Sequence, residues 1–248
     1  MRKSKIFIIN GFILTITSLI LKGSGLLFNI YIANKVGQET IGIFSLVMSL
    51  YTFAITLASA GIGLSCTCIV AEEFEKKNFN EGLKCVQLCI FFSTIISIIT
   101  SFLLILLAPI FTEKLFYNNI SNIPLYLISI GLPFISVSSV ISAYFTSIGK
   151  SYKNALSQIF ELIIKIIVTI LLMNLNIRSN ISSICSILLL ADIISEFCSF
   201  AFNIILYKFE LKNFKLKRNY TKKICKKIIK KSIPLAFTSY VRSRSIFT

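Results

Sequence analysis

Six long apolar runs constrain what this chain can fold into. Each run is long enough to cross about 30 Å of hydrocarbon as an α-helix. Only 15% of the 248 residues are charged, and the mean hydropathy is +0.83. A soluble domain typically has about 25% charged residues. The sequence therefore predicts an all-α, polytopic membrane helix bundle with six transmembrane helices. The predicted spans are residues 6–33, 41–70, 85–111, 122–147, 154–175 and 181–207.

The positions of Lys and Arg predict the orientation of these spans. If the N-terminus is cytoplasmic, 19 of the 26 basic residues fall in cytoplasmic segments and 3 in external loops. An excess of basic residues marks cytoplasmic loops. We therefore expect a multi-pass protein of the cell membrane with a cytoplasmic N-terminus.

The basic residues also divide the chain into three predicted parts. Residues 1–207 form the six-helix transmembrane lobe. Residues 208–231 form a Lys-rich cytoplasmic linker, which can also contact anionic membrane lipids. Residues 232–248 resemble the start of an incomplete seventh helix, because the apolar stretch is short and contains Arg242 and Arg244.

Composition excludes several functions. The net charge of +16 does not indicate a nucleic-acid partner, since the basic residues lie between apolar runs and do not form one basic face. The chain has no histidine, which excludes catalysis by a Ser-His-Asp or Cys-His site. We expect no catalytic residue, no metal and no cofactor. A membrane glycosyltransferase is disfavoured because the external loops offer only Glu39 and Glu113 as acidic residues.

Five charged residues lie near the centres of predicted spans. Lys22 is in the first, Glu161 and Lys165 share a face of the fifth, and Asp192 and Glu196 share a face of the sixth. An unpaired charge at that depth costs about 2.5–3.5 kcal/mol, so these side chains should face a shared interior.

These five charges allow two interpretations. They can form ion pairs that only hold the bundle together, with Glu161 and Lys165 paired within one helix. Alternatively, they line a polar substrate-binding cavity that includes Lys22, Glu161 and Lys165, in which Lys22 and Lys165 provide cationic contacts to an anionic substrate. Asp192 and Glu196 would then share a proton or bind a coupling cation. The second interpretation is narrowly favoured.

Several stretches resemble a known family. They are GFILTITSLILKGSGLLFNIYIANKVGQETIGIFSL (11–46), ASAGIGLSCTCIVAEE (58–73), ALSQIFELIIKI (155–166) and ISEFCSF (194–200). Their order and spacing resemble the SpoVB-like (stage V sporulation protein B) polysaccharide biosynthesis and export proteins of the multidrug, oligosaccharidyl-lipid and polysaccharide exporter superfamily. Proteins of that family run to about twice this length, so the chain is expected to be their N-terminal half, truncated or with a second lobe encoded separately.

The resemblance implies an architecture and a function. It implies one lobe of a two-lobe exporter that opens a central cavity alternately to each side of the membrane. The implied function is a flippase, not an enzyme, that moves a lipid-linked oligosaccharide or peptidoglycan precursor across the cytoplasmic membrane. The implied process is spore cortex or cell-wall polysaccharide synthesis. The alternatives are an ion-coupled multidrug exporter and a non-transporting membrane scaffold.

Overall fold

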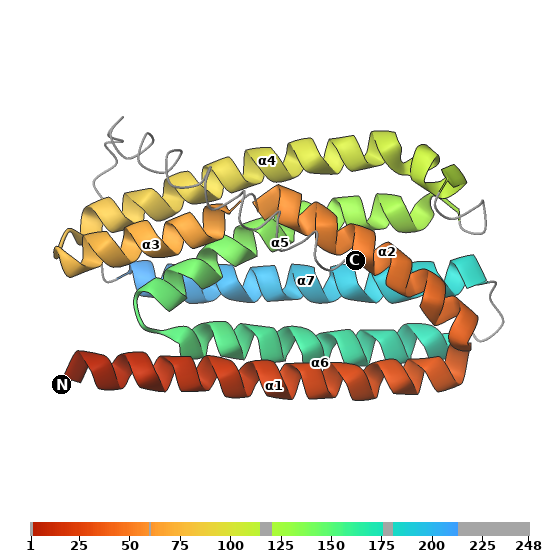
Figure 1. Cartoon of the computed structure of the whole chain (residues 1–248), viewed down its shortest axis with the longest axis horizontal. Coiled ribbons are helices and arrows are strands. Elements are labelled where there is room, and N and C mark those ends of the chain that lie inside the picture. The colour runs from red at the N-terminus through yellow and green to blue at the C-terminus, as the bar shows by residue number, and fades with distance from the viewer. Residues whose placement is uncertain (1, 60, 115–120, 176–180, 213–248) are drawn as a thin grey trace.

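The protein folds into a bundle of long helices (Figure 1). The computed structural model describes residues 2–59, 61–114, 121–175 and 181–212. The helices in these residues are α1 (Arg2–Val36), α2 (Gln38–Ser59), α3 (Ile62–Glu75), α4 (Phe79–Lys114), α5 (Ile123–Ser147), α6 (Ser151–Leu175) and α7 (Ile181–Leu211). Most of the predicted linker and all of the predicted seventh helix, residues 213–248, lie outside the described residues.

Six of these helices are long and apolar enough to cross a membrane, and they correspond to the six predicted spans. The second predicted span differs from the observed helices, because it is divided between α2 and the shorter α3. Gly61, which precedes α3, has a φ of 68°, a left-handed conformation that glycine adopts without a steric penalty. Apolar content alone could not reveal this break, since hydrophobicity continues across it.

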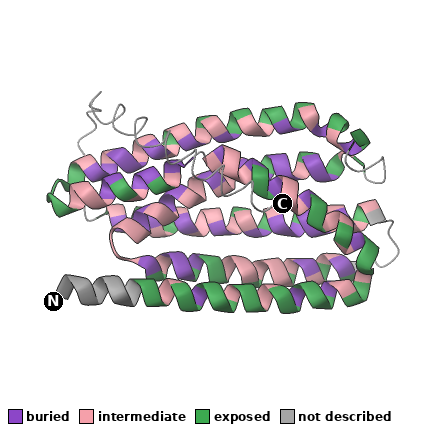
Figure 2. Cartoon of the chain, viewed as in Figure 1, coloured by how far each residue is buried: buried purple, intermediate pink, exposed green. Residues whose placement is uncertain are grey.

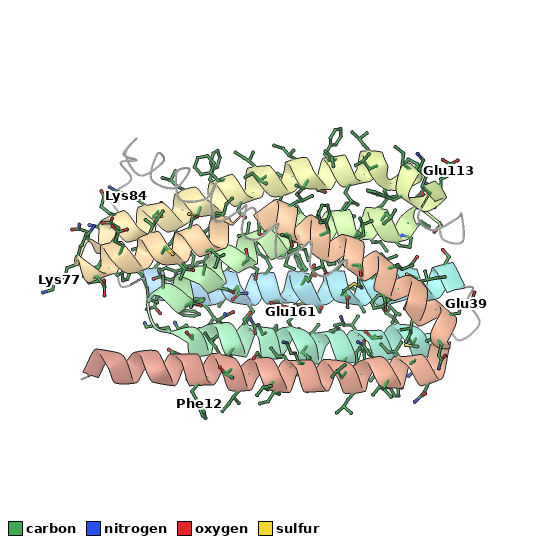
Figure 3. All side chains as sticks on the ribbon, in the orientation of Figure 1. Phe12, Glu39, Lys77, Lys84, Glu113 and Glu161 are labelled. Carbon is green, nitrogen blue, oxygen red and sulfur yellow. The ribbon has the colours of Figure 1, made fainter. Side chains whose placement is uncertain are left out.

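The two ends of the bundle differ in charge. The α3–α4 turn, the α5–α6 turn and the C-terminal end of α7 lie at one end, together with the N-terminus of α1 (Figure 1). Lys77 and Lys84 lie at this end, and Glu39 and Glu113 lie at the opposite end (Figure 3). The segments predicted to share one side of the membrane are therefore together.

Burial is concentrated in two of the spans. In the most apolar 18 residues of α5 and α7, 44% of residues are buried, against 11% in α1. Helices α5 and α7 pack against each other in the interior, whereas α1 contacts mainly α6 and α2. Figure 2 shows the corresponding green, exposed residues along α1. Large exposed apolar side chains on α1 include Phe12, Leu19 and Leu27.

A proline in α5 changes how that helix packs. Pro133 lies inside the helix and has no backbone N–H, so the carbonyl of Ser129, four residues earlier, loses its helical donor. The Ser101 hydroxyl of α4 donates a hydrogen bond to this carbonyl oxygen at 2.7 Å. The contact satisfies the freed carbonyl and joins α4 to α5.

A cluster of charges joins two helices at the basic end of the bundle. Glu210 of α7 accepts hydrogen bonds from Lys150 and Lys153, which flank the start of α6. Gly149 allows the tight α5–α6 turn, because its φ of 72° is in the left-handed region. The cluster holds the end of α7 beside the start of α6.

Candidate functional site

Four of the five predicted site residues come together between α6 and α7. Glu161 and Lys165 are one helical turn apart on α6, and Asp192 and Glu196 are one turn apart on α7. Helices α6 and α7 pack directly against each other, which brings these two pairs into one interior cluster. Figure 3 labels Glu161 among the side chains near the middle of the bundle.

Lys165 forms an ion pair across the two helices. Its Nζ lies 2.7 Å from Oδ1 of Asp192, whose side chain is only 6% exposed. The other carboxylate oxygen of Asp192, Oδ2, has no hydrogen-bond partner among the described residues. The first interpretation of the sequence expected ion pairs between helices, and Lys165–Asp192 is such a pair. Its other part, an ion pair of Lys165 with Glu161 within α6, is not present among the described residues.

Glu196 has a different partner. The Tyr51 hydroxyl of α2 donates a hydrogen bond of 2.5 Å to Oε2 of Glu196. This pair lies against Gly131 of α5, where a Cβ atom would come within 2.8 Å of both the Tyr51 and the Glu196 oxygens. Asp192 and Glu196 therefore have separate partners on different helices. The sequence does not predict Tyr51 or Gly131 here, because no local spacing connects α2, α5 and α7.

A pair of serine hydroxyls joins α6 to α7 in the region of Glu161. The Ser199 hydroxyl of α7 lies 3.2 Å from that of Ser157 on α6, and both serines are buried. The interface between α6 and α7 is therefore polar as well as apolar.

Two cavities adjoin this cluster, each of about 280 Å³. The first lies between α1 and α6 and is lined by Gly25, Asn29, Gln158, Glu161 and Lys165, among others. The second lies between α1 and α2. Asn29 and Lys165 line both cavities, so the two adjoin. The structure therefore places Glu161 and Lys165 at the wall of a cavity.

Lys22 is located differently from the other four predicted residues. It is exposed near the middle of α1 and is not among the residues that line either cavity. It belongs to the α1 polar stripe, in which small or polar residues alternate at intervals of four and three along one side of the helix. The stripe consists of Gly11, Thr15, Ser18, Lys22, Gly25 and Asn29.

Helix α2 carries a second series, the α2 hydroxyl stripe, that sequence inspection could have found. Ser45, Ser49, Thr52 and Thr56 recur at intervals of four, three and four, so their hydroxyls lie along one side of the helix. Three of them line the second cavity. Strong apolar character in the rest of α2 hides this periodicity when only hydropathy is considered.

The arrangement of helices matches that of known membrane transporters. A multidrug resistance MATE family transporter of the MOP superfamily, in an outward-facing conformation, matches with a TM-score of 0.73 and 13% identity, over 98% of this chain and 54% of that one. A MOP superfamily transporter from Pyrococcus furiosus matches with a TM-score of 0.69 and 16% identity, over 95% of this chain and 53% of that one. The fold is therefore about half of a MATE-type transporter fold.

Sequence comparison then gives the family. Residues 7–245 match the family described as polysaccharide biosynthesis protein, and the chain belongs to this family. It is also 22% identical over 220 residues to the stage V sporulation protein B of Bacillus subtilis (strain 168). That alignment covers 88% of this chain and 42% of the relative, so the chain spans less than half the length of the relative. The chain is a multi-pass membrane protein of the polysaccharide biosynthesis protein family, and about half of a MATE-type fold accounts for its helices.

Proposed function

We propose that this chain is one lobe of a flippase for a lipid-linked oligosaccharide or peptidoglycan precursor. In this proposal the substrate passes along the face formed by α1 and α2. Lys22 attracts its anionic diphosphate, and Glu161 and Lys165 form part of the cavity wall. Membership of the polysaccharide biosynthesis family and the similarity to stage V sporulation protein B support spore cortex or cell-wall polysaccharide synthesis as the process.

The observation that carries the proposal is the position of Lys22. Its side chain is exposed near the middle of a membrane-length helix, and no ion pair or hydrogen bond of its ammonium occurs among the described residues. An ammonium at this depth is costly to expose to lipid. The α1 polar stripe therefore requires water, a ligand or another protein surface beside it, as in a transport path.

In this proposal, the interior carboxylates Asp192 and Glu196 are the site where ion binding is coupled to transport. Asp192 has one carboxylate oxygen without a described partner, and Glu196 accepts a hydrogen bond from a helix other than the one that holds Asp192. A proton or cation that reached these carboxylates would weaken the Lys165–Asp192 or the Tyr51–Glu196 contact. Either change would alter how α7 packs against α6 or α2, which couples ion binding to the helix arrangement.

A second lobe is the proposed partner. The solved transporters that this chain resembles are about twice as long as the matched part. We propose that the exposed side of α1 and α2 faces such a lobe across the substrate path. The proposed orientation places the basic end of the bundle in the cytoplasm, as the distribution of Lys and Arg supports.

The test is lipid translocation in proteoliposomes that contain the full chain, alone and with a co-expressed second lobe. The substrate is a fluorescent polyprenyl diphosphate oligosaccharide, and the measurement is loss of fluorescence to a reductant that cannot cross the membrane. The wild-type protein should accelerate exchange of this lipid between leaflets. Lys22→Ala should slow the exchange by about tenfold or more, since it removes a charge-assisted contact.

Lys22→Arg is the matched control, because it keeps the cation and should keep most of the activity. Unchanged translocation by the Lys22→Ala variant would contradict a role for Lys22 in the substrate path. Absence of translocation by the wild-type chain, with and without a second lobe, would contradict the proposed function and favour a scaffold role.

A further inference from the structure

The second cavity has a wall of hydroxyl groups. We call this cavity the hydroxyl groove, the space of about 280 Å³ between α1 and α2 lined by Ser45, Ser49 and Thr52 on one side. Its volume is close to the lower end of the roughly 300–1,000 Å³ that is typical of small-molecule sites. The groove is therefore large enough for a small group, such as one ring of a larger ligand.

The three hydroxyls each donate their hydrogen to a backbone carbonyl of α2. Ser45, Ser49 and Thr52 donate to the backbone carbonyls of Ile41, Ser45 and Met48, at 2.8, 2.9 and 2.8 Å. Each hydroxyl has one hydrogen and two lone pairs, so the free capacity of each oxygen is to accept hydrogen bonds. The wall formed by α2 is consequently rich in acceptors, and it favours a ligand that brings donors.

The charges at the groove do not favour an anion. Lys165 is the cation in the lining, and its Nζ lies 2.7 Å from Oδ1 of Asp192, so a carboxylate already offsets its charge. A phosphate has acceptor oxygens and would face the lone pairs of the α2 hydroxyls. A neutral group with hydroxyl or amide N–H donors suits this wall better than a phosphate does.

The rest of the lining is mainly apolar, with Asn29 of α1 and Lys165 of α6 as its other polar residues. Phe44 and Phe53 line it from α2, and Ile32 lines it from α1. A flat aromatic side chain offers an apolar surface of low conformational entropy. A sugar ring has C–H groups on its faces and hydroxyl donors at its edges, so it can contact both kinds of wall at once.

We propose that the hydroxyl groove binds a sugar unit of the lipid-linked substrate and not its diphosphate. The proposal rests on the proposed function and deepens it, because it divides substrate recognition between two surfaces. The α2 hydroxyl stripe accepts hydrogen bonds from the sugar, and the diphosphate is attracted by Lys22 of α1, outside the groove.

The test compares two lipids on the purified full chain. One is a polyprenyl diphosphate that carries a single N-acetylhexosamine, and the other is the same polyprenyl diphosphate without a sugar. Binding is measured by microscale thermophoresis in detergent. The variant Ser45→Ala/Ser49→Ala/Thr52→Val removes the three acceptors. Alanine supports a helix at least as well as serine, and valine keeps the shape of threonine.

We expect this triple variant to bind the sugar-bearing lipid about tenfold or more weakly, since each lost hydrogen bond contributes about two- to tenfold. Its affinity for the lipid without the sugar should stay unchanged. Lys22→Ala should weaken binding of both lipids. Thr94→Val on α4 is the matched control, because Thr94 makes the same helix-internal hydrogen bond, to Ile90, and lines neither cavity.

Three results would overturn the inference. The triple variant could bind the sugar-bearing lipid as tightly as the wild-type protein does, or it could lose affinity for both lipids equally. Wild-type protein that binds neither lipid would contradict the proposed function itself, and the inference would fall with it. The single variant Ser45→Ala distinguishes lost recognition from misfolding, because it changes only one exposed side chain. Its affinity for the sugar-bearing lipid should fall about two- to tenfold, while its melting temperature should be unchanged.

Discussion

The absence of a side chain at residue 131 determines whether α2 and α7 can form their hydrogen bond. A Cβ at Gly131 would lie 2.8 Å from both Tyr51 Oη and Glu196 Oε2, which is closer than non-bonded atoms allow. We expect Gly131→Ala to push these oxygens apart and to lower the free energy of unfolding by about 1–3 kcal/mol, as overpacking typically does. The measurement is thermal unfolding of purified protein in detergent.

A second substitution tests whether a clash with the Tyr51 hydroxyl causes the loss of stability in Gly131→Ala. Tyr51→Phe removes one of the two oxygens that the new methyl group would contact. The double variant Gly131→Ala/Tyr51→Phe should therefore lose less stability than the sum of the losses in the two single variants. Fully additive losses would show that Gly131 acts through some other contact.

The Lys165–Asp192 pair is a second test at this scale. Asp192→Asn leaves the Lys165 ammonium without its partner inside the bundle, and we expect a loss of about 3 kcal/mol. This is the lower end of the range for buried pairs, because the Lys165 side chain is 34% exposed. Lys165→Met/Asp192→Leu removes both charges and should be less destabilising than Asp192→Asn, again by thermal unfolding. A double variant that is less stable than the single one would contradict this.

Single residues were only partly predictable from the sequence. A spacing of four places Glu161 beside Lys165, and Asp192 beside Glu196, on one helix face each. The partner that each charge selects depends on how the helices pack. Lys165 pairs with Asp192 of α7, and Tyr51 reaches Glu196 from a helix about 145 residues earlier. No periodicity within one helix contains that information.

Among the elements, α5 depends on a neighbour for one of its backbone groups. Ser101 of α4 donates to the Ser129 carbonyl that Pro133 leaves without a helical donor. We expect Ser101→Ala to lower the free energy of unfolding by about 1–3 kcal/mol, since it leaves an acceptor unsatisfied inside the bundle. The same thermal unfolding measurement applies.

Restoring a backbone N–H at residue 133 should remove the loss of stability caused by Ser101→Ala. In a Pro133→Ala background the Ser129 carbonyl can regain its helical donor, so Ser101→Ala should then cost little. An equal cost in both backgrounds would mean that Ser101 stabilises the bundle in another way.

The elements themselves follow closely from hydropathy, because each apolar run must satisfy its backbone hydrogen bonds internally in a membrane. The six runs predict the six long helices. Hydropathy does not predict the division of the second span into α2 and α3, since Gly61 is flanked by apolar and small residues on both sides. That break is a matter of backbone conformation.

For the whole molecule, the two ends of the bundle must lie on opposite sides of the membrane. We expect a cysteine at residue 77 to be accessible from the cytoplasm and one at residue 113 to be accessible from outside, because both native side chains are exposed and lie at opposite ends (Figure 3). The variants are Lys77→Cys and Glu113→Cys in a background without the native cysteines. Labelling of intact cells with an impermeant maleimide should modify only the second.

Labelling of both positions from one side would contradict the six-span topology. Labelling of residue 77 alone in intact cells would keep the topology and reverse the proposed orientation. The topology was predictable because it depends on the alternation of loops, which the sequence contains directly. The side of α1 that none of the described helices covers was not predictable, since it depends on which neighbours pack around that helix.

The sparse packing of α1 has a consequence for how the protein can move. Only 11% of its most apolar stretch is buried, whereas α5 and α7 have 44% buried. Among the described helices, displacing α1 would break fewer interior contacts than displacing α5 or α7, so a tilt or bend of α1 should cost less than a movement of either. A ligand that bound α1 would therefore act on the least buried of the described spans. Asn29 of α1 and Lys165 of α6 line the same two cavities, so a shift of α1 there would reach the cluster of buried charges.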